Sequence, residues 1–160
     1  MSSRIILITG GNSGLGLAAA RSFLSESPKN SVWLGVHSKR GSADALAAEF
    51  TGRCQSLALD VTQPTAWQSA VNQIVSQHQR LDVLVNNAGI HQDGLLANLT
   101  FHSWQQVIAT NLDATFHGCQ AVLPTMIAQR GGRIVNVASL SALLAPAGQT
   151  NYAAAKAGVV

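Results

Sequence analysis

The chain has 160 residues, of which 47% are hydrophobic and 11% charged, which is ample apolar material for one core. Its net charge is +3 and its basic residues are scattered, with Lys39-Arg40 the only adjacent pair, so nucleic acid is not expected as a partner. No apolar stretch is long enough to span a membrane and no signal peptide is evident, so we expect a cytoplasmic protein without a membrane partner. The two cysteines and five histidines lack ligand spacing, so we expect no metal site.

The first predicted elements are a strand, a glycine-rich turn and a helix. Arg4–Thr9 is a short apolar run that predicts a buried parallel strand, and Leu15–Leu24 has the apolar face of a helix. Between them stand Gly10, Gly14 and Gly16. This order favours a dinucleotide site, because glycines let the backbone approach a pyrophosphate and the helix N-terminus favours an anion. The glycine spacing differs from the commoner fingerprint, and a tight turn without a ligand is the alternative.

Strands and helices alternate along the rest of the chain. Pro64 favours a helix start, Thr100 is a predicted N-cap, and Pro124 should kink its helix or end it early. The expected strands are Ser31–Val36, Cys54–Leu59, Leu81–Val85 and Arg133–Ser139, and the expected helices are Ser42–Phe50, Thr62–His78, Thr100–Gln129 and one that begins near Gln149. Such alternation predicts an α/β fold, a Rossmann-type doubly wound parallel sheet with helices on both faces.

Polar and glycine-rich segments follow the predicted strands. They are Gly10–Gly16, Asp60, Asn86–Gly89 and Ser139. Open α/β sheets bind ligands at the carboxyl ends of their strands. The sequence therefore predicts one site at this edge of the sheet.

Tyr152 and Lys156 are four residues apart in the last predicted helix, so they lie on one face of it. An ammonium near a phenol favours the phenolate, and such a phenol can exchange a proton with a carbonyl or alcohol oxygen. Ser139, at a strand end, is placed to hold that oxygen. The pair alone is weak evidence, because many surface helices contain one by chance.

Together these motifs resemble the short-chain dehydrogenase/reductase family over the whole chain. The matching residues are Thr9-Gly10, Gly14, Gly16, Asp60-Val61, Asn86-Asn87-Ala88-Gly89, Asn111, Ser139, Tyr152 and Lys156. Within the family, residues 92–96, 132–136 and 148–152 are most similar to the 3-oxoacyl-[acyl-carrier-protein] reductases.

The resemblance implies four catalytic roles. Tyr152 would be the general acid in carbonyl reduction, and Lys156 would assist it and hold the nicotinamide ribose. Ser139 would hydrogen-bond the substrate oxygen, and Asn111 would position Lys156 through a water. The alternatives are a surface aromatic for Tyr152, a strand-end turn former for Ser139 and a mid-helix residue bonded to its own chain for Asn111.

The resemblance also implies the cofactor contacts. Gly10, Gly14 and Gly16 would shape the pyrophosphate loop, and Asp60 would accept from the adenine amino group unless it merely caps the next turn. The full set is Gly10, Asn12, Ser13, Gly14, Leu15, Gly16, His37, Ser38, Lys39, Asp60, Val61, Asn87, Ala88, Gly89, Tyr152 and Lys156.

The end of the second predicted strand indicates which dinucleotide is used. It carries no acid before Asp44, whereas an acid there normally binds the free ribose 2′-hydroxyl of NAD. His37 falls where many NADP-dependent relatives place an arginine, and Lys39 is nearby. Ser13 falls where some place a second arginine, so one usual phosphate contact is lacking. We expect NADP(H) rather than NAD(H), with a solvated basic loop as the alternative.

The implied reaction is NADPH-dependent reduction of a 3-oxoacyl thioester, carried by acyl carrier protein, to the 3-hydroxyacyl form in fatty acid or polyketide biosynthesis. Arg130 falls where such reductases place a docking residue for the carrier, with a solvated helix end as the alternative. The resemblance also implies a homodimer or homotetramer. Two alternatives remain open: an oxidoreductase of a small sugar, steroid or secondary alcohol, and a non-catalytic dinucleotide-binding protein. Because relatives continue past Val160, we expect residues 1–160 to be one catalytic domain lacking its C-terminal part.

Overall fold

The computed structural model describes residues 3–12, 14–38 and 40–160. Five parallel strands form one sheet in the order β3-β2-β1-β4-β5. The strands are β1 (Ile5–Thr9), β2 (Ser31–Val36), β3 (Cys54–Ala58), β4 (Val83–Asn86) and β5 (Arg133–Asn136). The predicted parallel α/β sheet is therefore confirmed.

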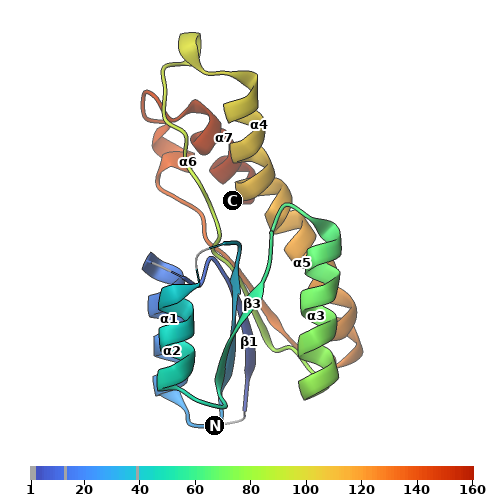
Figure 1. Ribbon diagram of the computed structural model, residues 1–160. Coiled ribbons are helices and arrows are strands. Elements are labelled where there is room, and N and C mark those ends of the chain that lie inside the picture. Colours follow the sequence, from blue (N-terminus) through green and yellow to red (C-terminus); the bar gives the residue numbers. More distant parts are fainter. Residues whose placement is uncertain (1–2, 13, 39) are drawn as a thin grey trace.

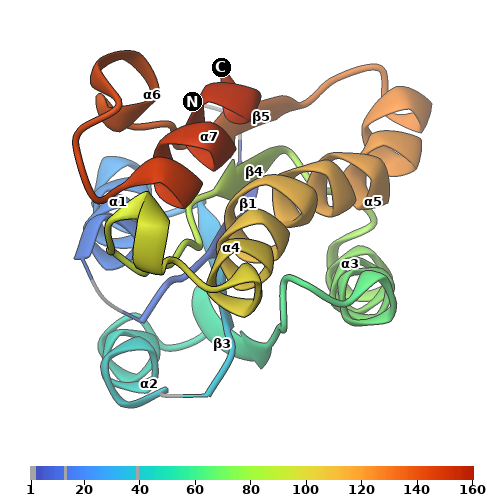
Figure 2. The ribbon, with the colours of Figure 1, turned by 90° about the horizontal axis from the view of Figure 1, so that it is seen from above.

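Helices cover both faces of this sheet, and further helices lie beyond the carboxyl ends of its strands. On one face lie α1 (Gly14–Glu26) and α2 (Gly41–Glu49), and on the other lie α3 (Pro64–His78) and α5 (Ala114–Ala128) (Figures 1 and 2). Beyond the carboxyl ends of the strands lie α4 (Phe101–Ile108), α6 (Ser141–Leu144) and α7 (Thr150–Val159) (Figure 1). A short 3-10 helix, η1 (Leu96–Asn98), precedes α4.

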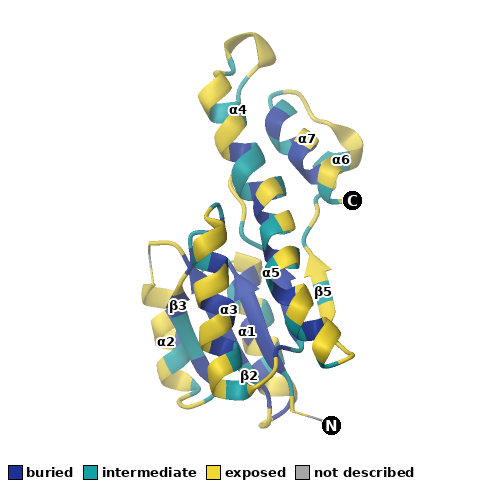
Figure 3. Ribbon diagram, turned by 90° about the vertical axis from the view of Figure 1, so that its right-hand side faces the viewer, coloured by how far each residue is buried: buried dark blue, intermediate teal, exposed yellow. Residues whose placement is uncertain are grey.

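The core has two halves because side chains alternate across a strand. Ile6 and Ile8 of β1 point to one face and pack with Leu24 of α1. Leu7 points to the other face and packs with Trp67 of α3, which is 1% exposed. All five residues of β1 are buried, whereas the edge strand β5 is mostly exposed (Figure 3).

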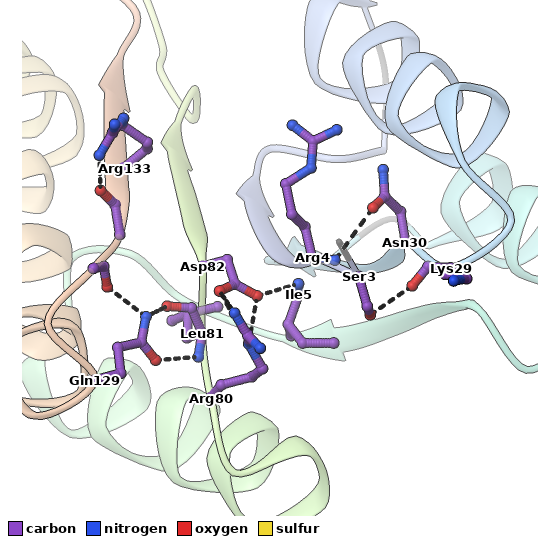
Figure 4. Close-up of polar contacts among 12 residues, drawn as sticks. Ser3, Arg4, Ile5, Lys29, Asn30, Arg80, Leu81, Asp82, Gln129 and Arg133 are labelled. Carbon is purple, nitrogen blue, oxygen red and sulfur yellow. Dashed lines mark hydrogen bonds and ion pairs between the residues drawn. The ribbon is translucent and has the colours of Figure 1, made fainter. Parts of the chain in front are cut away.

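Two strand boundaries, the start of β4 and the end of β5, differ from the sequence prediction by more than one residue, because side chains and turns take over the backbone groups. Both backbone groups of Leu81 bond the side chain of Gln129, with Gln129 Nε2 donating to Leu81 O at 2.7 Å, so β4 begins only at Val83 (Figure 4). At the other end, Asn87 turns away to bond Thr9. The bond from Val137 N to Asn86 O is therefore the last one between β4 and β5. The strand β5 ends at Asn136, and the predicted strand end at Ser139 is wrong.

The long predicted helix is interrupted by one π-helical segment, η2 (Ala109–Asp113), which joins α4 to α5. Thr100 caps α4 as predicted, with its Oγ1 accepting from Ser103 N at 3.1 Å. The expected early end at Pro124 is wrong, since α5 continues to Ala128. The carbonyl that Pro124 leaves without a donor belongs to Gln120, and both residues are exposed, so water can bind it.

No helix in the described part of the chain is both long enough and apolar enough to cross a membrane.

Candidate functional site

A cleft of about 820 Å³ lies where the carboxyl ends of the strands meet. Eight of the predicted cofactor residues line it: Gly10, Asn12, His37, Ser38, Asp60, Val61, Ala88 and Gly89. Of the other predicted residues, Ser13 and Lys39 lie outside the described part of the chain. Six predicted residues do not line the cleft, although each lies near a residue that does in sequence or in the structure. They are Gly14, Leu15, Gly16, Asn87, Tyr152 and Lys156.

The glycine turn leaves open space in front of α1. Gly10 and Gly14 have φ of 64° and 51°, the left-handed region that glycine adopts without strain. A Cβ at Gly16 would lie 2.5 Å from Gly10 O, so only glycine lets α1 begin this close to the turn. A Cβ at Gly14 would meet nothing within 4 Å, and Leu15 is 61% exposed. The N-terminus of α1 is therefore open beside Gly14, and a helix N-terminus favours an anion.

The turn is fastened to the segment after β4 by two side chains. Thr9 Oγ1 accepts from the backbone N–H groups of Asn87 and Ala88, both at 3.0 Å. Asn87 Nδ2 donates to Thr9 O at 2.9 Å and to Gly10 O at 3.3 Å. Asn87 therefore braces the two loops against each other, and this brings Ala88 and Gly89 to the cleft.

Asp60 caps the turn after β3, and it also lines the cleft. Its Oδ1 accepts from Thr62 N at 3.0 Å and from Thr62 Oγ1 at 2.7 Å, which caps the turn after β3. Its Oδ2 lies 3.7 Å from Nε2 of His37. Burial opposes the charged form of Asp60, but the bonds from Thr62 and the nearby His37 outweigh it and lower the pKa of this carboxyl. A carboxylate therefore stands in the cleft at neutral pH.

Lys156 is a buried amine at the catalytic end of the site, with 4% of its surface exposed. Its Nζ donates to Val137 O at 2.6 Å and lies 5.8 Å from the ring centroid of Tyr152, one turn earlier in α7. Burial lowers the pKa of the Lys156 ammonium. The helix geometry predicted for the pair is confirmed, and the bond to Val137 ties it to the chain just before Ser139.

Asn111 lies buried in η2 and bonds across to another segment. Its Oδ1 accepts from Ile90 N at 2.8 Å, and its Nδ2 donates to Ile90 O at 2.7 Å. It is therefore not a residue that merely bonds its own helix. A Cβ at Gly89 would lie 2.9 Å from Asn111 Oδ1 and 3.8 Å from Lys156 Nζ. Gly89 thus touches both the cleft and two of the four predicted catalytic residues.

The other two predicted catalytic residues are partly exposed. Ser139 follows β5, and its Oγ accepts from Ser141 N at 3.2 Å at the start of α6. Tyr152 N donates to Oδ1 of Asn151, whose Nδ2 in turn donates to Gln92 O at 3.0 Å. The start of α7 is thereby held against the segment that follows β4.

A family model described as short chain dehydrogenase matches residues 4–160. The chain belongs to this family. It is similar to the 3-oxoacyl-[acyl-carrier-protein] reductase FabG of Chlamydia pneumoniae, with 40% identity over 97% of this chain and 62% of the relative. The corresponding figures are 40%, 100% and 65% for FabG of Thermotoga maritima, and 34%, 98% and 63% for FabG of Escherichia coli. The chain therefore spans just under two thirds of the length of these relatives.

A solved structure shows the same fold. The crystal structure of a short-chain dehydrogenase from Streptomyces avermitilis superposes with a TM-score of 0.92 at 28% identity, covering 99% of this chain and 57% of that one.

In this short-chain dehydrogenase, several residues at the site were not among the site residues predicted from the sequence. His91 packs edge-on against Tyr152, with ring centroids 6.5 Å apart, and its Nδ1 lies 3.6 Å from Asp93. Gln92 donates to Gln106 across the cleft wall, and both line the cleft. The available signals were that residues 91–93 lie just after the Asn86–Gly89 motif and that residues 92–96 resemble the 3-oxoacyl reductases. Among the described residues, no three His, Cys, Asp or Glu side chains gather closely enough to hold a metal.

Proposed function

We propose that this protein reduces the 3-oxo group of an acyl thioester, bound to acyl carrier protein, to a 3-hydroxy group with NADPH as the hydride donor. The observation that carries the proposal is the position of Gly89, which lines the cleft and lies close to both Asn111 and Lys156. The substrate class rests on the relatives at 34 to 40% identity whose name is 3-oxoacyl-[acyl-carrier-protein] reductase.

The residues at the strand ends suit a dinucleotide. The open space at Gly14, before the first turn of α1, would take the pyrophosphate, and Asp60 would accept from the adenine amino group. Lys156 would bind the ribose on the nicotinamide side. When bound, the nicotinamide supplies the hydride, and the protein supplies orientation and electrostatics.

The proton would come from Tyr152. Its hydroxyl, as general acid, would protonate the carbonyl oxygen, and the ammonium of Lys156, 5.8 Å from the ring centroid, favours the phenolate left behind. The hydroxyl of Ser139 would donate to the same carbonyl oxygen and hold it toward Tyr152. Asn111 would hold Ile90, which lines the cleft, in place through its two bonds to the backbone of Ile90.

The preference for NADPH over NADH rests on the end of β2. His37 and Ser38 line the cleft there, and Asp60 is the one carboxylate among the described lining residues. Because His37 lies against Asp60, a protonated imidazole would offset that carboxylate and attract a 2′-phosphate.

We also infer a homodimer or homotetramer in the cytoplasm. Phe116, Leu123 and Ile127 recur at helical spacing on α5 and are 59%, 42% and 70% exposed. This apolar stripe runs along a helix whose outer face is open to solvent (Figure 3). A second copy packed against it would bury the stripe.

The direct test measures NADPH oxidation with acetoacetyl thioester on acyl carrier protein, comparing wild type with Tyr152→Phe. Removing the general acid should lower kcat by at least about 100-fold, while NADPH binding, followed by its fluorescence, stays within twofold. A Tyr152→Phe variant that keeps most of its kcat would show that the assigned chemistry is wrong. If the protein turns over small ketones but no acyl thioesters, the acyl thioester is the wrong substrate class, and the substrate is a free alcohol or ketone.

A further inference from the structure

Among the described residues, the basic side chain that lines the cleft at the end of β2 is His37. His37 and Asp60 are the two titratable side chains among the described residues that line the cleft. His37 Nε2 lies 3.7 Å from Asp60 Oδ2, and their side chains are 73% and 38% exposed. The pair therefore meets solvent and any group bound at the end of β2.

The other described charged groups nearby keep a constant charge around neutral pH, and Lys39 lies outside the described residues. Asp60 stays a carboxylate, since its hydrogen bonds lower its pKa. On α2, Asp44 accepts from Ser56 Oγ at 2.5 Å, and Arg40 precedes the helix as an exposed guanidinium outside the cleft lining. Histidine is the side chain whose charge ordinarily changes between pH 5 and 8.

The 2′-phosphate would be attracted when His37 is protonated and repelled by Asp60 when His37 is neutral. With His37 protonated, the cation pairs with the phosphate and offsets Asp60. With His37 neutral, the carboxylate of Asp60 faces a phosphate that is a dianion above about pH 6. An arginine at position 37 would remain charged throughout and would show no such difference.

We propose that His37 makes the choice between phosphorylated and unphosphorylated dinucleotide depend on pH, with NADP(H) preferred at slightly acid pH and the preference declining as the medium becomes alkaline. This inference rests on the proposed function, because it requires the cleft to bind the adenosine half of a nicotinamide dinucleotide. Under this proposal, binding of the 2′-phosphate and protonation of the His37 imidazole favour each other.

The test uses two half-ligands, adenosine 2′,5′-bisphosphate and 5′-AMP, so it requires no turnover. Calorimetric affinities are measured at pH 6.5 and 8.5 and constant ionic strength for wild type, His37→Gln and His37→Arg. For wild type, the affinity ratio of bisphosphate to AMP should fall at least about fivefold between the two pH values. The ratio should be low at both pH values in His37→Gln, and high at both in His37→Arg.

Proton uptake gives a second readout that a merely structural role would not move. Titrations with the bisphosphate at pH 7.5 in two buffers of different ionisation enthalpy should show proton uptake by wild type and a smaller uptake by His37→Gln. Since the side chain is exposed, both variants should keep the wild-type thermal midpoint.

Each other outcome has a distinct meaning. If neither nucleotide binds at either pH, the dinucleotide site and the proposed function fail. If AMP is preferred at both pH values, the assignment of NADPH fails. If the bisphosphate is preferred equally at both pH values, or if His37→Gln keeps the pH dependence of wild type, NADPH stands and the role of His37 is overturned in favour of a cation with constant charge.

Discussion

Replacing His78 should destabilise the protein in a pH-dependent way. Trp33 in β2 is 1% exposed, and its Nε1 donates to His78 Nε2 at 3.1 Å, at the last residue of α3. In His78→Ala the indole N–H loses its partner. A lost hydrogen bond costs about 0.5–1.5 kcal/mol net, and a buried donor left unpaired costs about 1–3 kcal/mol. Because His78 is only half-buried and water can reach part of the gap, we expect a loss of about 1–2 kcal/mol at pH 7.5.

The same bond sets the direction of the pH effect. Nε2 can accept only while the imidazole is neutral, and burial lowers the pKa of His78, although the end of a helix favours a cation. The unfolded state therefore binds more protons than the folded state. Stability from this group is fully present above the unfolded value of about 6.5 and is lost as the pH falls through the lower folded pKa.

The assay is urea unfolding followed by tryptophan fluorescence at pH 7.5 and 5.0. The matched control is His102→Ala, because His102 is exposed on α4, and its loss should stay within about 0.5 kcal/mol. The stability gap between wild type and His78→Ala should narrow at pH 5.0, since wild type alone loses the bond. A gap that is absent at pH 7.5, or one that widens at pH 5.0, would refute the reasoning.

Three further predictions concern the turn, the carrier and the oligomer. Gly16→Ala would place a Cβ 2.5 Å from Gly10 O and should abolish nucleotide binding in calorimetry, whereas Gly41→Ala, with nothing within 4 Å, should bind like wild type. Arg130→Glu, at an exposed position in the turn after α5, should raise KM for carrier-bound substrate at least about fivefold, with KM for a small thioester unchanged; equal effects on both would contradict a docking role. Phe116→Glu should convert the oligomer to monomer in light scattering, because a charge in the apolar stripe opposes its burial, and an unchanged mass would place the interface elsewhere.

The fold could be predicted from the sequence because its signals are local. Apolar runs ended by glycine or polar residues located all five strands, and the strand ends brought the dinucleotide motifs to one edge. Strand boundaries depended on distant partners. Gln129 takes the backbone groups of Leu81, and Thr9 takes the N–H of Asn87, and neither pairing is visible in the pattern of one strand.

The sequence could indicate site residues that belong to a known motif. It could not indicate contacts that arise only when distant segments pack together. The π-helical turn at η2 has no glycine or proline, and Asn111 is fixed there by Ile90, which lies 21 residues away in sequence. His91 reaches Tyr152 only because α7 folds back over the segment after β4. The sequence showed the strand end and the helix separately, so this contact could not be derived from either.

The bond from Lys156 to Val137 uses only one of the hydrogens on this amine. An ammonium has three hydrogens to donate, and one already points at a main-chain carbonyl 19 residues earlier. Two remain for whatever occupies the site. Under the proposed function, the same nitrogen both holds α7 in place and takes part in the reaction, so replacing Lys156 should loosen α7 and abolish activity together. Methionine, which keeps the length of the stem but donates nothing, would lose both functions in one substitution.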